Sequence, residues 1–392
     1  MMRIYMDHAA ATPVRRRVLD SMLPYFDKEF GNPSTVYDMG SRVKEVVEEQ
    51  RQKVAGLIGA RPGEIIFTSS GAEANNLAIK GVAFSGQKKG NHIVVSSIEH
   101  HSVLNSARFL ERMGFEVSFL AVDEHGLVDP ERLAKAIRPE TVLVSVMHGN
   151  NEIGTIQPIS ELSTICREKG VLFHTDAVAT AGNIPVKVDE LGVDLLSLSG
   201  VSLGGPKGIG ALYFKQKVRL MPLIHGGIQE SGRRAGTENV PAIVGLGKAA
   251  EIVAEELGTR INQLRVQGMK NALVSGIQER IKEVKYTGHP EKRLPGHASF
   301  CFEAIEGEAL LFMLSQRGIY ANTGSACASK ALKTSPVLAA IGIPPELAQG
   351  SIVFTMNSSN SIEEVEYILE NLPPAVEKLR SLSPLWKQSM AA

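Results

Sequence analysis

The sequence is poor in cysteine, has no excess of either charge and contains no long apolar run. Its 392 residues include three cysteines, Cys166, Cys301 and Cys327, which are too few and too scattered for a disulfide framework. No Cys-x-x-Cys pair occurs, so one chain alone offers no self-contained thiolate zinc site. The sequence therefore gives no sign of a fold held together by disulfides or by zinc.

The charges are balanced. Lys and Arg together number 42, as do Asp and Glu, which argues against binding nucleic acid or membrane through a broad basic surface. No apolar run reaches the roughly 18 residues that span a bilayer. The first residues also lack the basic start and apolar stretch of a signal peptide. We expect a cytoplasmic protein that binds neither nucleic acid nor membrane.

Short apolar runs rich in strand-forming residues alternate with helical patterns from about residue 40 to about residue 215. This alternation predicts an α/β fold with a mainly parallel sheet and helices on both faces. Ligands of such sheets usually bind at the carboxyl ends of the strands. The predicted strands are 64–69, 92–96, 116–120, 141–147, 171–175, 194–199 and 210–214, and the clearest helices are 43–57, 102–113 and 159–169.

The pattern changes after Glu230. The chain becomes mostly helical, then mixes strands, loops and helices, and then is helical again. These three segments are 240–285, 288–356 and 362–382. The change predicts a second domain joined to the first by a long helix. We expect a large domain at 16–255 and a smaller α+β domain made of 1–15 and 256–392.

Nine polar or glycine-rich motifs are distributed along the chain, several of them directly after predicted strands. They are YMDHAAATP (5–13), GNPST (31–35), FTSSGAEANN (67–76), SSIEHHSV (96–103), MHGNNEIGT (147–155), HTDAV (174–178), GGPKGIGALY (204–213), RRAGTEN (233–239) and TGSACAS (323–329). In this order and spacing they make almost the whole chain resemble the IscS/NifS cysteine desulfurases. The resemblance implies the type I aminotransferase-like fold, a homodimer and an active site at the dimer interface.

The resemblance also implies a site for pyridoxal phosphate. The cofactor needs an acidic partner on its pyridine nitrogen to act as an electron sink, and Asp176 matches that partner. His100 matches the histidine that stacks on the ring, and Asn151 a residue that faces it. Ser199 matches a phosphate-binding hydroxyl, and Thr237 one that reaches the phosphate of the neighbouring subunit. Asp176 and both hydroxyl residues have an alternative interpretation as turn or cap residues.

The largest departure from the family is at Ser202. The family carries a His-Lys pair after the strand that reads DLLSLS here, and this chain has Val201-Ser202 at that place. A serine hydroxyl forms no imine with the cofactor aldehyde and is a poor shuttle for the α-proton of the substrate. Lys207 is no clear substitute, because it belongs to the GPKG motif of the family and lies outside the imine-forming position.

Four further departures fall on the same implied site. Ala72 replaces a phosphate-binding threonine, although the preceding Ser70 is a possible compensation. Ala179 replaces the glutamine that bonds the phenolic oxygen of the cofactor, and Val201 replaces the histidine beside the lysine. Val353, in SIVFT, replaces the arginine that clamps the substrate carboxylate, a bidentate contact for which an apolar side chain is no substitute.

Cys327 is the part of the family's apparatus that remains. It lies in TGSACAS, a run of small residues that matches the loop carrying the persulfide-forming cysteine, which delivers sulfur to a scaffold protein. Thiolates are also the preferred ligands of iron–sulfur clusters. Cys166, in a helical pattern, and Cys301, in a strand-like run, are predicted to be buried structural thiols.

The favoured hypothesis is an accessory protein of iron–sulfur cluster assembly without normal desulfurase activity, similar to a branch of the family that lacks the lysine. It would dock an IscU-type scaffold, and Cys327 would be one ligand of a shared [2Fe–2S] cluster. Pyridoxal phosphate would be absent or held without a covalent bond.

Two alternatives stay open. One is an active desulfurase that turns L-cysteine into L-alanine and a persulfide on Cys327. The other is a structural or regulatory dimer whose Cys327 is a relic. A smaller hypothesis concerns the only tryptophan, Trp386, which is expected to contribute to docking or else to pack on its own domain.

Overall fold

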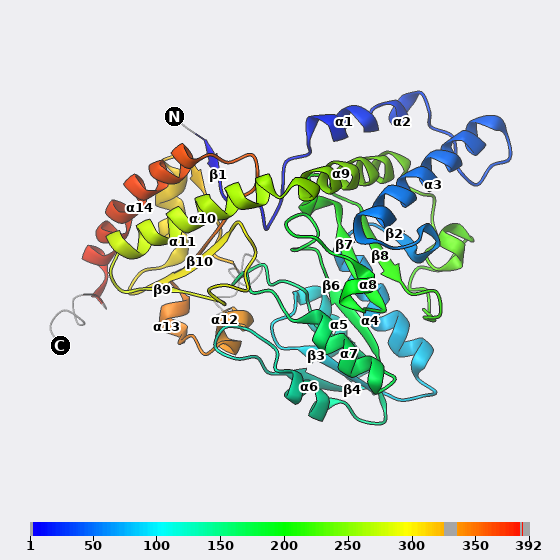
Figure 1. The fold of residues 1–392 in the computed structure, drawn as a ribbon, viewed down its shortest axis with the longest axis horizontal. Coiled ribbons are helices and arrows are strands. Elements are labelled where there is room, and N and C mark those ends of the chain that lie inside the picture. Colours follow the sequence, from blue (N-terminus) through cyan, green and yellow to red (C-terminus); the bar gives the residue numbers. More distant parts are fainter. Residues whose placement is uncertain (1–2, 325–334, 385, 387–392) are drawn as a thin grey trace.

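A seven-stranded sheet forms the centre of the molecule (Figure 1). The computed structural model describes residues 3–324, 335–384 and 386. The strand order is β2-β8-β7-β6-β5-β3-β4, and β8 alone runs antiparallel to its neighbours. The strands are β2 Ile65–Thr68, β3 His92–Ser96, β4 Glu116–Leu120, β5 Thr141–Ser145, β6 Leu172–Asp176, β7 Leu195–Ser199 and β8 Gly210–Phe214. Each predicted strand and the mainly parallel sheet are confirmed.

Helices cover both faces of this sheet because its inner strands are apolar on both sides. Ile93 and Val95 of β3 pack on one side with α4 and α5, whereas Val94 between them packs into the opposite core. The helices of the first side are α4 Gly71–Gly86 and α5 His101–Arg112. Those of the second side include α1 Arg16–Met22, α3 Asp38–Ile58, α6 Pro130–Ala136, α7 Ile159–Glu168 and α9 Val240–Thr259.

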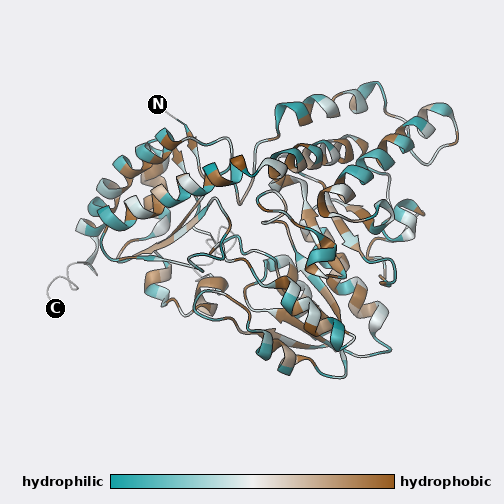
Figure 2. Ribbon diagram, in the orientation of Figure 1, coloured by the Kyte–Doolittle hydropathy of each residue, from teal (hydrophilic) through white to brown (hydrophobic). Residues whose placement is uncertain are grey.

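Short elements connect the layers. They are α2 Pro24–Asp27, α8 Val188–Leu191 and the 3₁₀ turns η1 Pro62–Glu64, η2 Gly200–Ser202 and η3 Gln229–Gly232. In the hydropathy view, α3 carries teal and brown positions along its length, as expected of a helix with one buried face (Figure 2). The polar face of such a helix can stay in contact with solvent.

A second core lies around a three-stranded antiparallel sheet in the order β12-β10-β9. Its strands are β9 Val284–Tyr286, β10 His297–Phe302 and β12 Ser351–Thr355, and its helices are α10 Ile261–Arg280, α11 Gly307–Ser315 and α14 Ile362–Leu382. The chain start joins this core, because β1 Ile4–Tyr5 pairs in parallel with β11 Ile319–Tyr320. Ile4 and Met6 are fully buried there.

The predicted long connecting helix is two helices. Helix α9 ends and α10 begins at Arg260, whose φ of 56° lies in the left-handed region and interrupts the helical hydrogen bonds. Two short helices near the chain end, α12 Pro336–Ala340 and α13 Pro345–Ala348, pack into the core of the large sheet, and α13 also contacts β10. The division at residues 15 and 255 stays a prediction.

Candidate functional site

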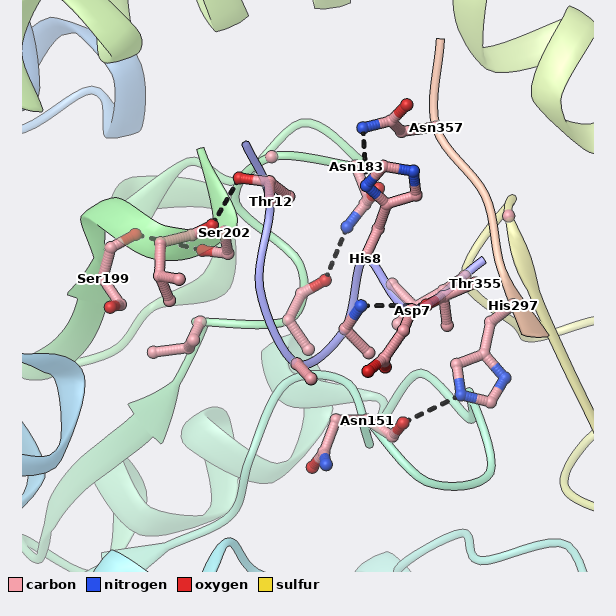
Figure 3. Close-up of a pocket in the computed structure, with 18 of the residues that line it drawn as sticks. Asp7, His8, Thr12, Asn151, Asn183, Ser199, Ser202, His297, Thr355 and Asn357 are labelled. Atoms are coloured by element: carbon pink, nitrogen blue, oxygen red, sulfur yellow. Dashed lines mark hydrogen bonds between the residues drawn. The ribbon is translucent and has the colours of Figure 1, made fainter. Parts of the chain in front are cut away.

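A cavity of about 730 Å³ lies between the two sheets (Figure 3). The large sheet contributes residues at the carboxyl ends of its strands, among them His100 after β3, Asp176 ending β6 and Ser199 ending β7. The small sheet contributes Val353 and Thr355 of β12. The expectation that ligands bind at strand ends thus agrees with the position of this cavity.

Asp176 forms the buried floor of the cavity. Its Oδ2 accepts a hydrogen bond of 2.6 Å from Nδ2 of Asn75 on α4, and its Oδ1 accepts one of 2.9 Å from the backbone N–H of Val178. Burial raises the pKa of Asp176, while these two bonds and the charge of His100 lower it. A carboxylate in this setting favours a protonated nitrogen as its next partner.

Glu99 lies beside Asp176 and is only 2% exposed. Its Oε1 accepts a bond of 2.6 Å from the backbone N–H of Met147, whereas its Oε2 has no partner among the described residues. Burial raises the pKa of Glu99 well above its usual range, and the charge of Asp176 raises it further. The neutral acid form is therefore favoured, with one buried oxygen unused.

His100 and Asn151 approach the cavity from two loops. His100 caps α5, because its Nδ1 accepts the backbone N–H of Ser102, and its ring remains exposed at the rim. The backbone carbonyl of Asn151 accepts a bond of 2.9 Å from Nε2 of His297. Burial lowers the pKa of His297 to about 3, so that ring is neutral. Both predicted ring-facing residues therefore line the cavity, and Figure 3 shows Asn151 with its bond to His297.

The turn into α4 closes one end of the cavity. Ser70 caps the helix by accepting the backbone N–H of Glu73, and Gly71 allows Val178 and Ser199 to pack close, since a Cβ there would lie 2.8 Å from the Val178 side chain. The first N–H groups of a helix lack intrahelical partners and suit an anion. Ser70, Ala72 and Ser199 all line the cavity at this end.

Thr237 is not among the residues that line this cavity. It lines a separate cavity of about 120 Å³ together with Ser69 and Arg234. Nε of Arg234 donates to Glu73 at 3.0 Å, which fixes this segment to the first turn of α4. The implied contact of Thr237 with a neighbouring subunit stays a prediction.

Ser202 ends the turn η2 at the cavity wall. Its Oγ donates to the backbone carbonyl of Ser199 at 3.0 Å, and Thr12 holds the same turn by donating to the carbonyl of Val201 (Figure 3). Within the described part of the chain, no lysine lines the cavity. Lys207 is exposed to solvent and is not among the lining residues.

Val353 forms part of the opposite wall, on β12. Its backbone exchanges hydrogen bonds with Asn322, and the Nδ2 of Asn322 donates to both carboxylate oxygens of Asp7 at 3.1 and 3.2 Å. Burial raises the pKa of Asp7. At this wall, where the resemblance predicts an arginine, the chain has Val353. The carboxyl group of Asp7 lies close by, because it bonds Asn322, the backbone partner of Val353.

Cys327 lies outside the described residues. The residues that flank this part of the chain are placed at the cavity: Gly324 lines it, and Ser335 donates a bond of 2.5 Å to Glu152, another lining residue. Burial raises the pKa of Glu152 to about 7, and the Ser335 bond lowers it.

Cys166 and Cys301 are fully buried, as predicted for structural thiols. Burial raises the pKa of each to about 12, so neither is a ready thiolate. No group of three or more potential metal-ligating side chains occurs within residues 3–324, 335–384 and 386. No helix in the same residues is long and apolar enough to cross a membrane.

Several cavity residues were not assigned a role from the sequence. They are Asp7, Asn75, Glu99, Glu152 and His297. The first four stand inside motifs quoted for the resemblance, so the signal was present, but no pattern indicates which motif residues point inward. The ring of Trp386 lies 4.2 Å from the guanidinium of Arg380, which agrees with packing on its own domain.

Comparisons with known proteins show the family of this chain. The chain matches the family described as Aminotransferase class-V over residues 4–368. The cysteine desulfurase IscS of Dictyoglomus turgidum is 49% identical, with 98% of each chain covered. The chain therefore belongs to the class-V aminotransferase family and, within it, to the IscS/NifS-type cysteine desulfurases. Cysteine desulfurase IscS 1 of Archaeoglobus fulgidus is 48% identical over 98% of this chain and 100% of its own.

The family's fold is also found in solved structures. A NifS-like protein superposes with a TM-score of 0.90 at 38% identity, with 96% of this chain and 100% of the other covered. The type I aminotransferase-like fold is thereby confirmed. The assignment of Ser202 to the lysine position of the family stays a prediction.

Pyridoxal phosphate is the cofactor expected of the family, and the cavity fits it in part. Asp176 fits a protonated ring nitrogen, and Glu99 beside it has a buried oxygen without a partner among the described residues. The turn at Ser70, which begins α4, fits a phosphate. Among the described residues no lysine lines the cavity, and Ser202 stands at the place where the resemblance predicts one. These described residues thus fit the ring and the phosphate but offer no amine for a covalent attachment.

Proposed function

We propose that this protein is a cytoplasmic, homodimeric, cysteine-desulfurase-like component of iron–sulfur cluster assembly that holds no covalent cofactor. It docks an IscU-type scaffold and supplies Cys327 to a nascent [2Fe–2S] cluster. The observation that carries the proposal is a family cavity with its buried aspartate kept and no lysine lining it in the described residues.

The chemistry of the cavity supports low desulfurase activity. When bound, pyridoxal phosphate supplies an electron sink for bonds at the substrate α-carbon. Asp176 can hold a ring-nitrogen proton, and His100 can cover the outer ring face. Ser202 cannot take the α-proton at neutral pH, because its hydroxyl is committed to the Ser199 carbonyl and is far less basic than an amine.

The described residues on either side of the cysteine segment support a role for Cys327. Gly324 lines the cavity near Glu152, and Ser335 donates a hydrogen bond to Glu152, which also lines it. A [2Fe–2S] cluster usually takes four protein ligands, mostly thiolates. With Cys166 and Cys301 buried in separate elements, the other ligands would come from the scaffold.

Exposed apolar side chains support a dimer. Val36, before α3, is 98% exposed and Ile228, before η3, is 90% exposed. Phe26 and Phe30 near α2 are also exposed. Large apolar side chains left in water mark an interaction surface, and a second copy of the chain is the occupant that the family provides.

The decisive test is cluster reconstitution with the full-length protein, the purified scaffold, iron and sulfide. We expect a scaffold-bound cluster whose spectrum and air stability depend on Cys327, so Cys327→Ser should weaken or alter it. Cys301→Ser is the matched control, because that thiol is buried. An unchanged cluster with Cys327→Ser would overturn the proposal.

A second candidate function is active cysteine desulfuration, favoured by the name of the 49% identical relative, cysteine desulfurase IscS. It would need an amine from outside the lysine position. Borohydride reduction with added pyridoxal phosphate, followed by peptide mapping, tests it directly. A reduced adduct together with cysteine-dependent sulfide release would establish this function instead.

A further inference from the structure

We propose that the cavity binds, without a covalent bond, a phosphorylated pyridine that already carries its own primary amine, of which pyridoxamine 5′-phosphate is the simplest. It binds this ligand in preference to the aldehyde form and to amino-acid adducts of the ring. The inference rests on the cofactor part of the proposed function, namely the missing imine partner.

The first argument is the charge of the cavity wall. Among its described lining residues, the only Lys or Arg is Arg15, and both terminal nitrogens of Arg15 bond the carboxylate of Glu256 at distances of up to 2.8 Å. The carboxyl groups of four residues line the same cavity: Asp7, Glu99, Glu152 and Asp176. An incoming ammonium group therefore meets a wall that lacks free cations and has acceptors for it.

The second argument is the pair of unused buried acceptors on the cavity floor. Glu99 and Asn75 are 2% and 1% exposed, and Glu99 Oε2 and Asn75 Oδ1 have no hydrogen-bond partner among the described residues. Buried polar atoms without partners are costly unless a ligand or water satisfies them. Both residues adjoin Asp176, so the floor at which the ring nitrogen would donate to Asp176 also has polar atoms left for a ligand or water.

The third argument is the space at Ser202. A serine side chain ends one atom beyond Cβ, where a lysine would extend four, and its Oγ turns away to the carbonyl of Ser199. The aldehyde form of the ligand would leave this space without a bonding partner. The amine form carries a nitrogen of its own on the ring substituent and so does not depend on the missing side chain.

The fourth argument concerns ligands with a carboxylate. An amino-acid adduct of the ring would place its carboxylate at the wall where the family has an arginine. Here that wall offers Val353, whose backbone partner Asn322 bonds the carboxyl group of Asp7. An apolar side chain and a nearby carboxyl group disfavour a second carboxylate. The amine form has none, so it avoids this cost.

Calorimetric titration of the full-length protein tests the order of affinities. The three ligands are pyridoxamine 5′-phosphate, pyridoxal 5′-phosphate and N-(5′-phosphopyridoxyl)-L-alanine, which carries a carboxylate. We expect the first to bind about tenfold or more tightly than the third, as one unfavourable charge contact predicts. Equal affinities of these two ligands, or tighter binding of the alanine adduct, would overturn the inference.

Two variants make the test specific. Val353→Arg should strengthen binding of the alanine adduct and weaken that of pyridoxamine 5′-phosphate, because it adds a free cation to the wall, whereas Asp176→Asn should weaken all three ligands. Glu111→Gln, on the exposed side of α5, is the surface control. An adduct trapped by borohydride would refute the cofactor part of the proposed function. Absence of any binding, with no trapped adduct, would refute only this inference.

Discussion

Two ends of the same cavity differ in what they have kept. The ring end, formed by Asn75, Glu99, His100 and Asp176, has buried carboxyl groups, short hydrogen bonds and a histidine at its rim. The reacting end, formed by Ala179, Val201, Ser202 and Val353, has no ionisable side chain. The ring end stays costly to maintain without a ligand, since a buried carboxylate needs a partner. The difference is the basis of the proposal that the cavity binds its ligand without a covalent bond.

The largest effect is expected from rebuilding the reacting end, which tests whether the two ends of the cavity differ as described. Ser202→Lys restores an imine partner but leaves Val353 facing the substrate carboxylate. A lost bidentate charge contact is worth roughly 2–5 kcal/mol, or about 30-fold to several-thousand-fold in rate. We expect the double variant with Val353→Arg to release sulfide from L-cysteine faster than Ser202→Lys by that factor.

The control for this experiment is Ser202→Met, which has nearly the length of lysine and no amine. It should trap no cofactor with borohydride and show no gain in turnover, with or without Val353→Arg. Equal rates of the single and double lysine variants would mean that Val353 does not occupy the carboxylate-binding position.

The second prediction removes the charge of the ring end. Asp176→Asn keeps the shape of the side chain but cannot hold a pyridinium proton. A hydrogen bond to a charged group contributes about 1.5–3 kcal/mol, so we expect pyridoxamine 5′-phosphate to bind about 10- to 100-fold more weakly. Calorimetry measures this, and thermal unfolding without ligand should show no destabilisation, because a buried carboxylate has been removed. Unchanged affinity would place the ring nitrogen elsewhere.

Much of this arrangement can be predicted from the sequence, for physical reasons. Apolar runs define strands wherever both faces are buried, and polar motifs after those runs mark the strand ends, so Asp176 and Ser199 are found easily. Strand direction is not encoded in such runs, and the antiparallel β8 is therefore not predictable from them. The helix break at Arg260 has only a weak local signal, Gly258 two residues earlier, because a single glycine is tolerated inside a helix.

Contacts between distant segments are the other part that the sequence does not reveal. Asp7 meets Asn322 across 315 positions, and that contact gives the wall around Val353 its charge. Likewise, Glu99 and Asp176 come together only because β3 and β6 end at the same edge of the sheet. The departures from the family can be read in the sequence, whereas their combined effect on the cavity requires the fold.

A third prediction concerns Glu152, which lies beside the reacting end and has its pKa raised to about 7 by burial. Its carboxyl group is neutral in the folded protein below that pH but loses its proton in the unfolded chain above about 4.3. The folded state is thus penalised progressively as pH rises from about 4.3 to 7, by about 3.5 kcal/mol in all.

Glu152→Gln removes this penalty while keeping an acceptor for the Ser335 hydroxyl. The difference in unfolding free energy between the variant and the wild type should therefore grow in favour of the variant from pH 4.5 to pH 7.5, measured by urea denaturation without ligand. Glu111→Gln, on an exposed helix face, should give a constant difference. A difference for Glu152→Gln that is also independent of pH would show that its pKa is not raised.

The smallest expected effect lies far from the cavity, at Trp386. Its ring covers the guanidinium of Arg380, which donates to the backbone carbonyls of Lys282, Glu283 and Glu303. A cation–π contact of this kind contributes about 0.5–1 kcal/mol, so Trp386→Ala should lower the melting temperature by about 1–2 °C and Trp386→Phe by less. Scaffold affinity should stay the same if the ring packs only on its own domain. A tenfold loss of scaffold affinity with an unchanged melting temperature would instead assign Trp386 to docking, and would extend the retained binding function from the cavity to the C-terminal end of the chain.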